Sequence, residues 1–378
     1  MDQAGRTESS SGARQKFALS PLVVIWEVTR ACDLACVHCR ASAIPEHETG
    51  ELTTGEGLAL IEQVRGFGKP VFVLTGGDPL KRQDIFDLIR SASASGLPTY
   101  MSPSGTPLLT HAGLLRARDS GLLGVSISLD GSTEEIHDRF RGVRGSFRLS
   151  LDAAASAVAL GLRLQINTTL TRHNLKDLPA IADLVGSLEA QRWTVFLLVP
   201  TGRALSSQQV SPDECEEVFA WLYELSKKAP FRIKTTEGPH YRRVALQRSG
   251  ASCERADNAV VVGTGSGGGR FVPGMNDGSG FLFISSKGAI HPSGFLPLPA
   301  GNVRTDSLTW VYREHPLFVA LRDPERLSGR CGRCEFRAVC GGSRARALAL
   351  TGDMLAEDPA CAYEPRGVSG DSAPAASL

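Results

Sequence analysis

Short apolar runs rich in β-branched residues alternate with longer amphipathic segments through the first half of the chain. Apolar runs of about four to eight residues are typical of buried strands, and the segments between them are long enough to hold helices. Strands joined through helices pair in parallel, and their crossovers wind in one direction. The pattern therefore predicts an α/β fold built as a partial (β/α)6 barrel, because an eight-stranded barrel would need two more units before the composition changes. The runs are Leu22–Val28, Val71–Leu74, Thr99–Ser102, Gly124–Leu129, Arg163–Leu170 and Thr194–Val199.

The second half of the chain has a different pattern. An amphipathic stretch from Ser211 to Ala229 begins with helix-capping residues and predicts a helix. Residues 263–280 are rich in glycine, but they lack the spacing and the Lys-Ser/Thr ending of a phosphate-binding loop, so we expect a lid or a linker. Apolar runs at Phe281–Ser285 and Ala289–Pro292 predict a small hairpin.

These patterns divide the 378 residues into parts of different character. The first 18 residues are polar, and the end of the chain is rich in Ser, Ala and Gly, a composition that does not support a packed core. We expect a disordered N-terminus at residues 1–18, the barrel at 19–235, a smaller second domain at 236–365 and a disordered tail at 366–378.

The charge balance narrows the choice of partners. Lys and Arg number 41 against 40 Asp and Glu, so no overall field favours nucleic acid or an anionic membrane. The polar N-terminus lacks the apolar core of a secretory signal, and no stretch of the sequence has 18 uninterrupted apolar residues. We expect a cytoplasmic protein with no nucleic-acid or membrane partner, whose nine cysteines, mostly in tight clusters, bind metal rather than form disulfides.

Cys32, Cys36 and Cys39 form a C-x3-C-x2-C pattern directly after the first predicted strand. A four-iron cluster normally takes four cysteines, so a loop that offers three leaves one iron open for chemistry. Zinc is an alternative if His38 supplies a fourth ligand, although its place between Cys36 and Cys39 would strain a tetrahedral site. Three unrelated buried thiols are a second alternative.

This loop resembles the cluster-binding loop of the radical S-adenosylmethionine (radical SAM) superfamily, whose fold is also a partial (β/α)6 barrel. In that family the open iron of a [4Fe–4S] cluster is chelated by SAM, and cleavage of SAM yields a 5′-deoxyadenosyl radical that takes a hydrogen atom from the substrate. The resemblance implies catalytic roles for Cys32, Cys36 and Cys39, with the cluster and SAM as cofactors. It also implies an electron donor such as flavodoxin or ferredoxin.

The carboxyl ends of the predicted strands carry the other residues that resemble the family. Gly76-Gly77-Asp78-Pro79 resembles its Gly-Gly-Glu-Pro stretch, whose backbone meets the SAM amino group, with Asp78 in place of the more usual Glu. The same stretch could be an ordinary turn, and so could the Asp-Gly pair at residues 130–131. The resemblance assigns SAM contacts to Gly76, Gly77, Asp78, Ser104, Ser128, Asp130, Arg141 and Asn167.

An arginine is expected to bind the SAM carboxylate, because a planar guanidinium can hold a carboxylate through two hydrogen bonds. The segment from His137 to Gly142 resembles the family segment that supplies this arginine. We choose Arg141 for this role, and Arg139 could equally be a solvated side chain on a helix end.

A second cysteine group near the end of the chain follows a C-x2-C-x5-C pattern with a distant fourth cysteine. Four thiolates make a closed site suited to electron transfer or structure, although zinc would fit them as well. The segment resembles the SPASM or twitch-like extension of radical SAM enzymes. Full SPASM domains bind two auxiliary clusters, whereas here only Cys253 remains for the first of them, because Ser293 and Ser343 stand where relatives carry cysteine. We therefore expect one auxiliary [4Fe–4S] cluster, held by Cys331, Cys334, Cys340 and Cys361.

The sequence around Cys340 and Cys361 resembles the branch that includes haem d1 and alternative haem biosynthesis enzymes. Peptide maturases such as the mycofactocin enzyme are also similar. The resemblance implies hydrogen abstraction from a small carboxylated metabolite or tetrapyrrole-like substrate in a biosynthetic pathway, with an oxidative outcome such as decarboxylation. A maturase acting on a ribosomally made peptide is the alternative, although the short N-terminus leaves no room for a winged peptide-recognition domain. A non-catalytic metal-binding redox sensor is a third hypothesis.

Two further features stay open at the level of sequence. The stretch from Lys234 to Arg243 is dense in His, Tyr and Arg, so it could face an anionic substrate such as a carboxylate or form a solvated helix start. Cys215 has no cysteine neighbour and is expected to be an ordinary thiol.

Overall fold

The computed structural model describes residues 17–250, 261–262, 269–270 and 274–366. The two predicted disordered ends lie outside these residues, apart from their innermost positions. Cys253 and half of the glycine-rich segment at 263–280 also lie outside them.

The six predicted strands are confirmed as neighbours in one parallel sheet. A seventh parallel strand continues this sheet beyond the sixth, where it pairs residue by residue from Arg192↔Arg232 to Phe196↔Thr236. The bounds are β1 Val23–Glu27, β2 Val71–Thr75, β3 Thr99–Met101, β4 Gly124–Ser128, β5 Arg163–Leu170, β6 Arg192–Leu197 and β7 Arg232–Thr236.

The predicted hairpin is also confirmed, and it extends the other edge of the same sheet. Its first strand, β10 (Phe281–Ile284), pairs in parallel with β1, while β11 (Ala289–His291) and β12 (Gly301–Asn302) follow antiparallel. The sheet thus runs in the order β12-β11-β10-β1-β2-β3-β4-β5-β6-β7 and crosses the expected boundary at residue 235, so the division into domains stays a prediction. A separate pair consists of β8 (Val261–Val262) and β9 (Gly269–Arg270).

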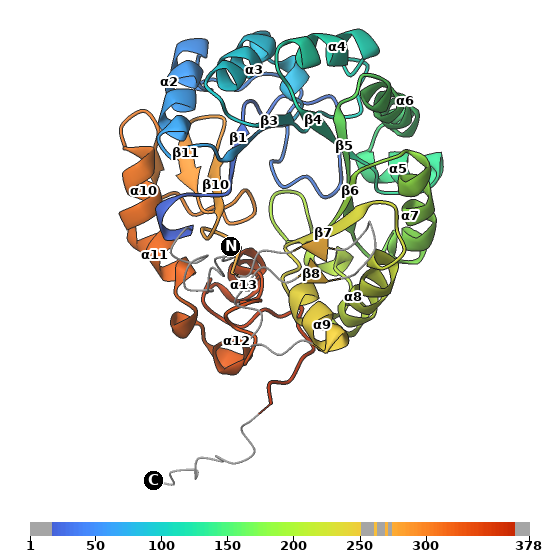
Figure 1. Ribbon diagram of the computed structural model, residues 1–378, viewed down its shortest axis with the longest axis vertical. Helices are drawn as coiled ribbons and strands as arrows, with labels where there is room; N and C mark the ends of the chain where they lie inside the picture. Colours follow the sequence, from blue (N-terminus) through green and yellow to red (C-terminus); the bar gives the residue numbers. More distant parts are fainter. Residues whose placement is uncertain (1–16, 251–260, 263–268, 271–273, 367–378) are drawn as a thin grey trace, which may run out of the picture.

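Helices cover the outside of the curved sheet, and α12 and α13 lie between its two ends in Figure 1. The barrel helices are α2 Thr54–Arg65, α3 Ile85–Ala94, α4 His111–Asp119, α5 Glu134–Arg141, α6 Ser146–Ala159, α7 Leu178–Ser187 and α8 Pro212–Ser226. The remaining helices are α9 His240–Ser249, α10 Leu308–Glu314, α11 Pro316–Arg322, α12 Gly329–Arg333 and α13 Arg344–Thr351. Single 3₁₀ turns are η1 Pro79–Lys81, η2 Leu175–Asp177, η3 Ser206–Gln208 and η5 Pro324–Arg326.

Alternation along the strands decides which side chains reach the core. In β5 every second residue is buried, and apolar residues of this kind pack outward against the helices together with the fully buried Trp26 and Trp193. The alternate positions point to the inside of the curve, where many of them are polar. The predicted helix after Ser211 is α8, which begins with a capping box between Ser211 and Glu214 and ends at Ser226 rather than Ala229.

Candidate active site

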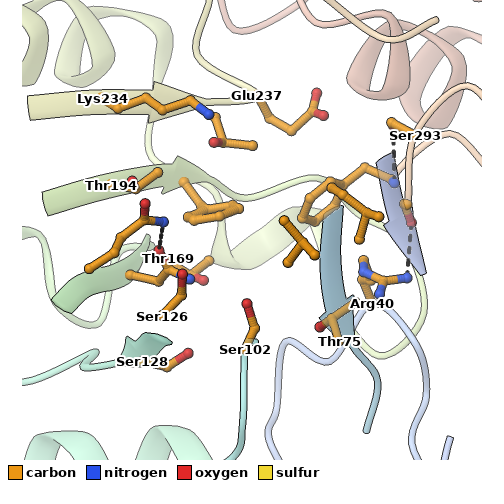
Figure 2. A pocket seen from close by; sticks show the side chains of 18 of the residues that line it. Arg40, Thr75, Ser102, Ser126, Ser128, Thr169, Thr194, Lys234, Glu237 and Ser293 are labelled. Atoms are coloured by element: carbon orange, nitrogen blue, oxygen red, sulfur yellow. Dashed lines mark hydrogen bonds between the residues drawn. The ribbon is translucent and has the colours of Figure 1, made fainter. Parts of the chain in front are cut away.

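A cavity of about 970 Å³ occupies the inside of the curved sheet and is lined by residues from β1 to β7 and from β10. Figure 2 shows hydroxyl-bearing side chains from several neighbouring strands on its wall, with Lys234 on β7 beyond them. Ligand sites of open parallel sheets gather at the carboxyl ends of the strands, and this cavity reaches that edge. The cavity is therefore the candidate active site.

Strand register arranges the polar residues of the wall into rows. Parallel pairing places Ser128 beside Asn167, Asn167 beside Thr194, and Thr194 beside Lys234. One pleat nearer the amino ends of the strands, a second row consists of Ser126, Gln165, Arg192 and Arg232. All eight side chains line the cavity, and neighbouring strands stand about 4.8 Å apart. The wall changes from hydroxyls and amides on β4 and β5 to cations on β6 and β7.

Cys32, Cys36 and Cys39 all line the cavity from the loop that follows β1. None of them forms a disulfide. Backbone N–H groups point at two of the sulfurs, because Leu34 N lies 3.4 Å from Cys32 Sγ and Ala43 N lies 3.4 Å from Cys39 Sγ. Three thiols that open into one cavity match the predicted three-ligand arrangement.

Backbone contacts hold this loop in shape. A hydrogen bond from Cys32 N to Ile44 O, at 2.8 Å, joins the two ends of the loop. Arg203, from the segment after β6, donates to Cys36 O and Ala43 O at 2.9 Å each. A Cβ on Gly202 would lie 2.4 Å from Cys39 O, so only glycine permits this close approach. The cysteine loop is thus fixed by its own closing hydrogen bond and by the segment that follows β6.

The surroundings of the thiols fit a metal cluster. Burial raises the pKa of Cys32 and of Cys36, so thiolates at these positions require a compensating positive charge. Arg141 supplies part of it, with Nη1 lying 3.7 Å from Cys36 Sγ, and a cluster would supply the rest. The His38 ring also lines the cavity and packs against Phe140 at 4.3 Å between centroids.

The glycine turn after β2 supports the cysteine loop from behind. Gly77 N and Asp78 N donate to Thr29 O and Ala31 O at 2.8 and 2.7 Å. A Cβ on Gly77 would lie 2.4 Å from Ala31 O, and one on Gly76 would lie 2.5 Å from Thr29 O. The nearby protein backbone therefore requires glycine at both positions. The sequence had suggested only a contact between this stretch and SAM. Gly76 and Gly77 also line the cavity.

Asp78 is fully buried and is engaged with protein groups. Its carboxylate accepts hydrogen bonds from Thr106 Oγ1 at 2.7 Å and Leu80 N at 3.1 Å. Ser104, in contrast, lines the cavity, with Oγ 2.9 Å from Gly77 O and 3.4 Å from Cys32 Sγ. Asp78 thus connects the ends of β2 and β3, and its SAM contact stays a prediction.

Asp130 and Arg141 form a buried ion pair beside the cysteines. Asp130 also accepts a hydrogen bond from Thr169 N at 2.7 Å, and it is fully buried, whereas Arg141 lines the cavity. The exposed Arg139 points away on the same helix, α5. The structure therefore places Arg141 at the cavity and places Asp130 behind it, where it orients the guanidinium. Ser128 and Asn167 line the cavity as expected, and all SAM contacts remain predictions.

The second cysteine group lies around α12, outside the lining of the large cavity. Cys331, Cys334, Cys340 and Cys361 are all free thiols. Backbone N–H groups again point at sulfur: Asp358 N lies 3.4 Å from Cys331, Phe336 N lies 3.4 Å from Cys334, and Gly342 N lies 3.5 Å from Cys340. Burial raises the pKa of Cys334 and of Cys361 to about 11, so these thiols too need a bound cation or cluster to ionise.

No group of three or more His, Cys, Asp or Glu side chains in the described part of the chain is arranged around a single metal ion. A cluster differs from an ion because each cysteine binds its own iron atom. Cys215 is buried within α8, and burial raises its pKa to about 12, as befits a thiol in the hydrophobic core.

Sequence reasoning missed the network that supports the second cysteine group. Arg346 on α13 donates to both oxygens of Asp358 at 2.9 Å each, and all of these groups are buried. Arg344 lies 3.7 Å from Cys331 Sγ through Nη2 and donates to Ala356 O at 2.6 Å. Two arginines spaced two apart after a Cys-Gly-Gly-Ser stretch were the only signal in the sequence, and their partners depend on the tertiary fold.

Ser293 and Ser343 lie close to two carboxyls, the half-buried Glu237 and the buried Asp277. Ser343 Oγ donates to Glu237, while Ala345 N donates to Asp277 Oδ2 at 3.0 Å. Burial raises the pKa of Glu237 well above its usual range, and the neighbouring Asp277 adds to this effect. Glu237 also adopts a φ of 54°, a strained conformation for a side chain of this kind. Ser293 and Ser343 thus form hydrogen bonds with a carboxyl pair at the cavity wall.

Three cysteines over a parallel-sheet cavity, backed by a glycine turn and an oriented arginine, define a cluster-dependent enzyme of the radical SAM class. Residues 26–185 match the family model described as the Radical SAM superfamily. The chain belongs to this superfamily, which uses a [4Fe–4S] cluster and SAM.

Individual relatives refine this assignment. The chain is 42% identical to AdoMet-dependent heme synthase from Oleidesulfovibrio alaskensis, a match that covers 91% of this chain and 88% of the relative. It is 30% identical to Fe-coproporphyrin III synthase from Methanosarcina barkeri, with 90% of this chain and 87% of the relative covered. Other relatives are named as a pre-heme d1 synthase and as peptide cyclases and maturases. The expected haem and peptide branches are both confirmed among its relatives.

Solved structures share the fold. Streptococcus suis SuiB bound to precursor peptide SuiA superposes with a TM-score of 0.69 at 15% identity, covering 91% of this chain and 76% of SuiB. This likeness over most of the chain confirms the expected fold class. Among the helices of the described residues, none is both long and apolar enough to cross a membrane.

Proposed function

We propose that this radical SAM enzyme converts iron coproporphyrin III into haem by oxidative decarboxylation of propionate side chains. The main support is the cavity, because about 970 Å³ of space with cations on one wall suits a large carboxylated ligand. Its relatives support the same choice, since one is named for making haem and another for making Fe-coproporphyrin III. These two compounds differ by vinyl groups in place of propionates.

The residues present fit both cofactor sites. Cys32, Cys36 and Cys39 would hold three irons of a [4Fe–4S] cluster, and Arg141, oriented by Asp130, would bind the SAM carboxylate. When bound, the cluster and SAM supply a 5′-deoxyadenosyl radical that removes a hydrogen atom from the substrate. An electron donor of the flavodoxin or ferredoxin class would provide the reducing electron.

Conversion of each propionate into a vinyl group releases carbon dioxide, one hydrogen atom and one electron. A C–H bond on the carbon next to the ring breaks, the hydrogen atom leaves, and the bond to the carboxylate then breaks to release carbon dioxide. A vinyl group and one surplus electron remain. The four thiols at Cys331, Cys334, Cys340 and Cys361 would hold a second cluster able to accept that electron.

The protein must orient the substrate so that only the intended C–H bond is exposed. The Ser128–Asn167–Thr194–Lys234 row offers hydrogen-bonding groups along the whole wall, from the arginine beside the cysteines to β7. The buried apolar side chains of Leu34 and Ala43 surround the cysteines and limit the access of water to them.

A peptide is the second candidate substrate, because relatives named as peptide cyclases are 30% identical to this chain over 95% of its length. The same cavity would then hold one side chain of the peptide rather than a macrocycle.

A direct assay separates the two candidates. Anaerobically reconstituted protein is incubated with SAM, dithionite and iron coproporphyrin III, and the products are resolved by liquid chromatography and mass spectrometry. We expect haem and 5′-deoxyadenosine to form together. Release of 5′-deoxyadenosine with the porphyrin unchanged, at every reductant tested, would contradict the proposal and favour the peptide.

A further inference from the structure

Positive charge is concentrated at one corner of the cavity wall. Arg192 on β6, Lys234 on β7 and Arg242 on α9 all line the cavity, and we call these three residues the cation corner. Arg192 and Lys234 are neighbours through register, since Lys234 pairs with Thr194 two residues after Arg192. The charges of Arg192 and Arg242 both act on Lys234 and lower its pKa. Arg192 lies one strand and Lys234 two strands beyond Asn167, on the side of the sheet that leads away from β1 and its cysteine loop.

Lys234 has no hydrogen bond or ion pair with any described residue; its ammonium lies 5.4 Å from the ring centroid of Phe281. Burial lowers the pKa of Lys234 to about 8, so its charge is only partly supported by the surroundings. Lys234 is half-buried on the cavity wall; a partly desolvated ammonium without a counter-ion is costly, and a carboxylate would offset that cost. The amine is therefore placed to receive an anion.

Arg242 lies in a similar environment. Its Nη1 donates to Val339 O at 3.1 Å, and no carboxylate in the described ranges pairs with it. Its guanidinium lines the cavity and reaches the backbone next to Cys340, so Arg242 connects the cation corner with the second cysteine group.

Three other arginines near the cavity are neutralised by carboxylates of the protein itself. Arg141 pairs with Asp130, Arg40 lies 3.1 Å from Glu27, and Arg243, the residue after Arg242, pairs with Glu216. These three arginines have carboxylate partners, whereas no carboxylate of the described residues pairs with Lys234 or Arg242. Arg163, Arg203 and Arg232, which also line the cavity, have no ion pair within the described residues either.

The two carboxyls that line the cavity near this corner are already engaged. Glu237 accepts a hydrogen bond from Ser343, and Asp277 accepts one from Ala345 N at 3.0 Å. Burial and mutual repulsion favour one shared proton on this pair, and the one remaining negative charge is held by Ser293, Ala345 N and Arg344 rather than by the cation corner.

We propose that Lys234 and Arg242, with Arg192 beside them, bind a carboxylate of the substrate. The inference rests on the proposed function and deepens it, because it assigns the residues that recognise an aliphatic carboxylate such as a propionate. Recognition at this corner fixes one side of a large ligand while another side chain faces the cysteines.

The test is a binding titration of the reconstituted holoenzyme with iron coproporphyrin III, followed by the absorbance of the porphyrin. Lys234→Met should weaken binding about 10- to 100-fold, the loss expected for a hydrogen bond to a charged group. Lys234→Arg should restore most of the affinity, because it keeps the charge. Lys228→Met, which removes an exposed lysine outside the cavity lining, should bind as tightly as the wild type.

Formation of 5′-deoxyadenosine without porphyrin reports on folding and on both cofactors, and all four proteins should retain it. Wild-type affinity in Lys234→Met would overturn the carboxylate site while leaving the proposed function intact. A wild-type protein that cleaves SAM but neither binds nor converts the porphyrin would overturn the proposed function, and the inference would fall with it. Arg242→Gln provides a second variant, with weaker binding expected and unchanged affinity again counting against the site.

Discussion

The two cysteine groups of this protein are built alike at the level of single sulfurs but differ in what surrounds them. In both groups backbone N–H groups point at sulfur from 3.4 to 3.5 Å, and an arginine lies 3.7 Å from one thiol. The first group has three cysteines on one loop that faces a cavity of about 970 Å³. The second has four cysteines behind that cavity, held by α13 and the Arg346–Asp358 pair.

Ligand number and location together separate the roles of the two groups. A cluster with three protein ligands beside a large cavity has an iron free for a second cofactor, whereas a fully ligated cluster is suited to passing electrons. Similar hydrogen bonds to sulfur can thus support different chemistry. The following predictions test this division, beginning with the largest expected effect.

Cys32→Ala should reduce 5′-deoxyadenosine formation to background, because two remaining thiols cannot hold a cluster with one open iron. Chromatographic measurement of 5′-deoxyadenosine after dithionite reduction provides the readout. The C-terminal group should still assemble, and its iron content serves as the control for folding. Appreciable SAM cleavage by this variant would place the reactive cluster elsewhere.

Cys334→Ala should retain some SAM cleavage while product formation is lost, because only the closed site is damaged. The ratio of product to 5′-deoxyadenosine should fall well below the wild-type ratio. A folded variant that retains its first cluster yet shows no SAM cleavage at all would argue against separate roles.

Asp130→Asn should weaken SAM binding about 10- to 100-fold, because Arg141 would lose its buried carboxylate partner. Equilibrium binding of SAM to the reconstituted protein measures the change. Arg139→Gln is the matched control, since this arginine lies on the same helix and is exposed. Equal affinity in the two variants would remove Arg141 from the SAM site.

Affinity for iron coproporphyrin III should fall as the pH rises above about 8, the pKa of Lys234 in the free protein. A bound carboxylate raises the pKa of this amine, so binding is strongest where the free amine is already protonated. Above that pH the affinity should drop by at most about tenfold per pH unit. Lys234→Arg should abolish this dependence, and a pH profile unchanged by that substitution would assign it to another group.

Gly77→Ala should destabilise the apo-protein by about 1–3 kcal/mol, because its Cβ would lie 2.4 Å from Ala31 O behind the first cysteine group. Gly55→Ala is the control: Gly55 lies in the first turn of α2 with open space around it, and the change should be neutral or stabilising by up to about 1 kcal/mol. Thermal unfolding monitored by circular dichroism distinguishes them. Similar stability of both variants would mean that the backbone at Gly77 can move.

The parallel sheet could be predicted because helices bury one face of each strand and leave an apolar pattern in the sequence. β7 was not predicted, because its five residues, Arg232–Thr236, include a single apolar side chain, Ile233. The strand exists through pairing with β6, and its inward positions are polar because they face the cavity. The parallel pairing of β10 with β1 was equally hidden, since it joins segments more than 250 residues apart.

The cysteines could be predicted from local spacing, and most residues assigned to SAM do line the cavity. Asp78 and Asp130 are exceptions: both are buried and hold neighbouring groups, which sequence cannot distinguish from direct ligand contact. The cation corner required the register of β6 with β7 and the placement of α9. From the sequence, Lys234–Arg243 could be either the solvated start of a helix or an anion-binding site. Tertiary structure decides between the two.

The central claim is that an open and a closed cluster act together on a carboxylated porphyrin. One experiment tests it most directly: anaerobic reconstitution, iron and sulfide counting, and product assay with SAM, dithionite and iron coproporphyrin III. We predict about eight irons per chain, four for each cluster, together with haem and 5′-deoxyadenosine. Iron at that level with no SAM cleavage would contradict the enzymatic account, and about four irons with zinc bound would make the C-terminal site structural.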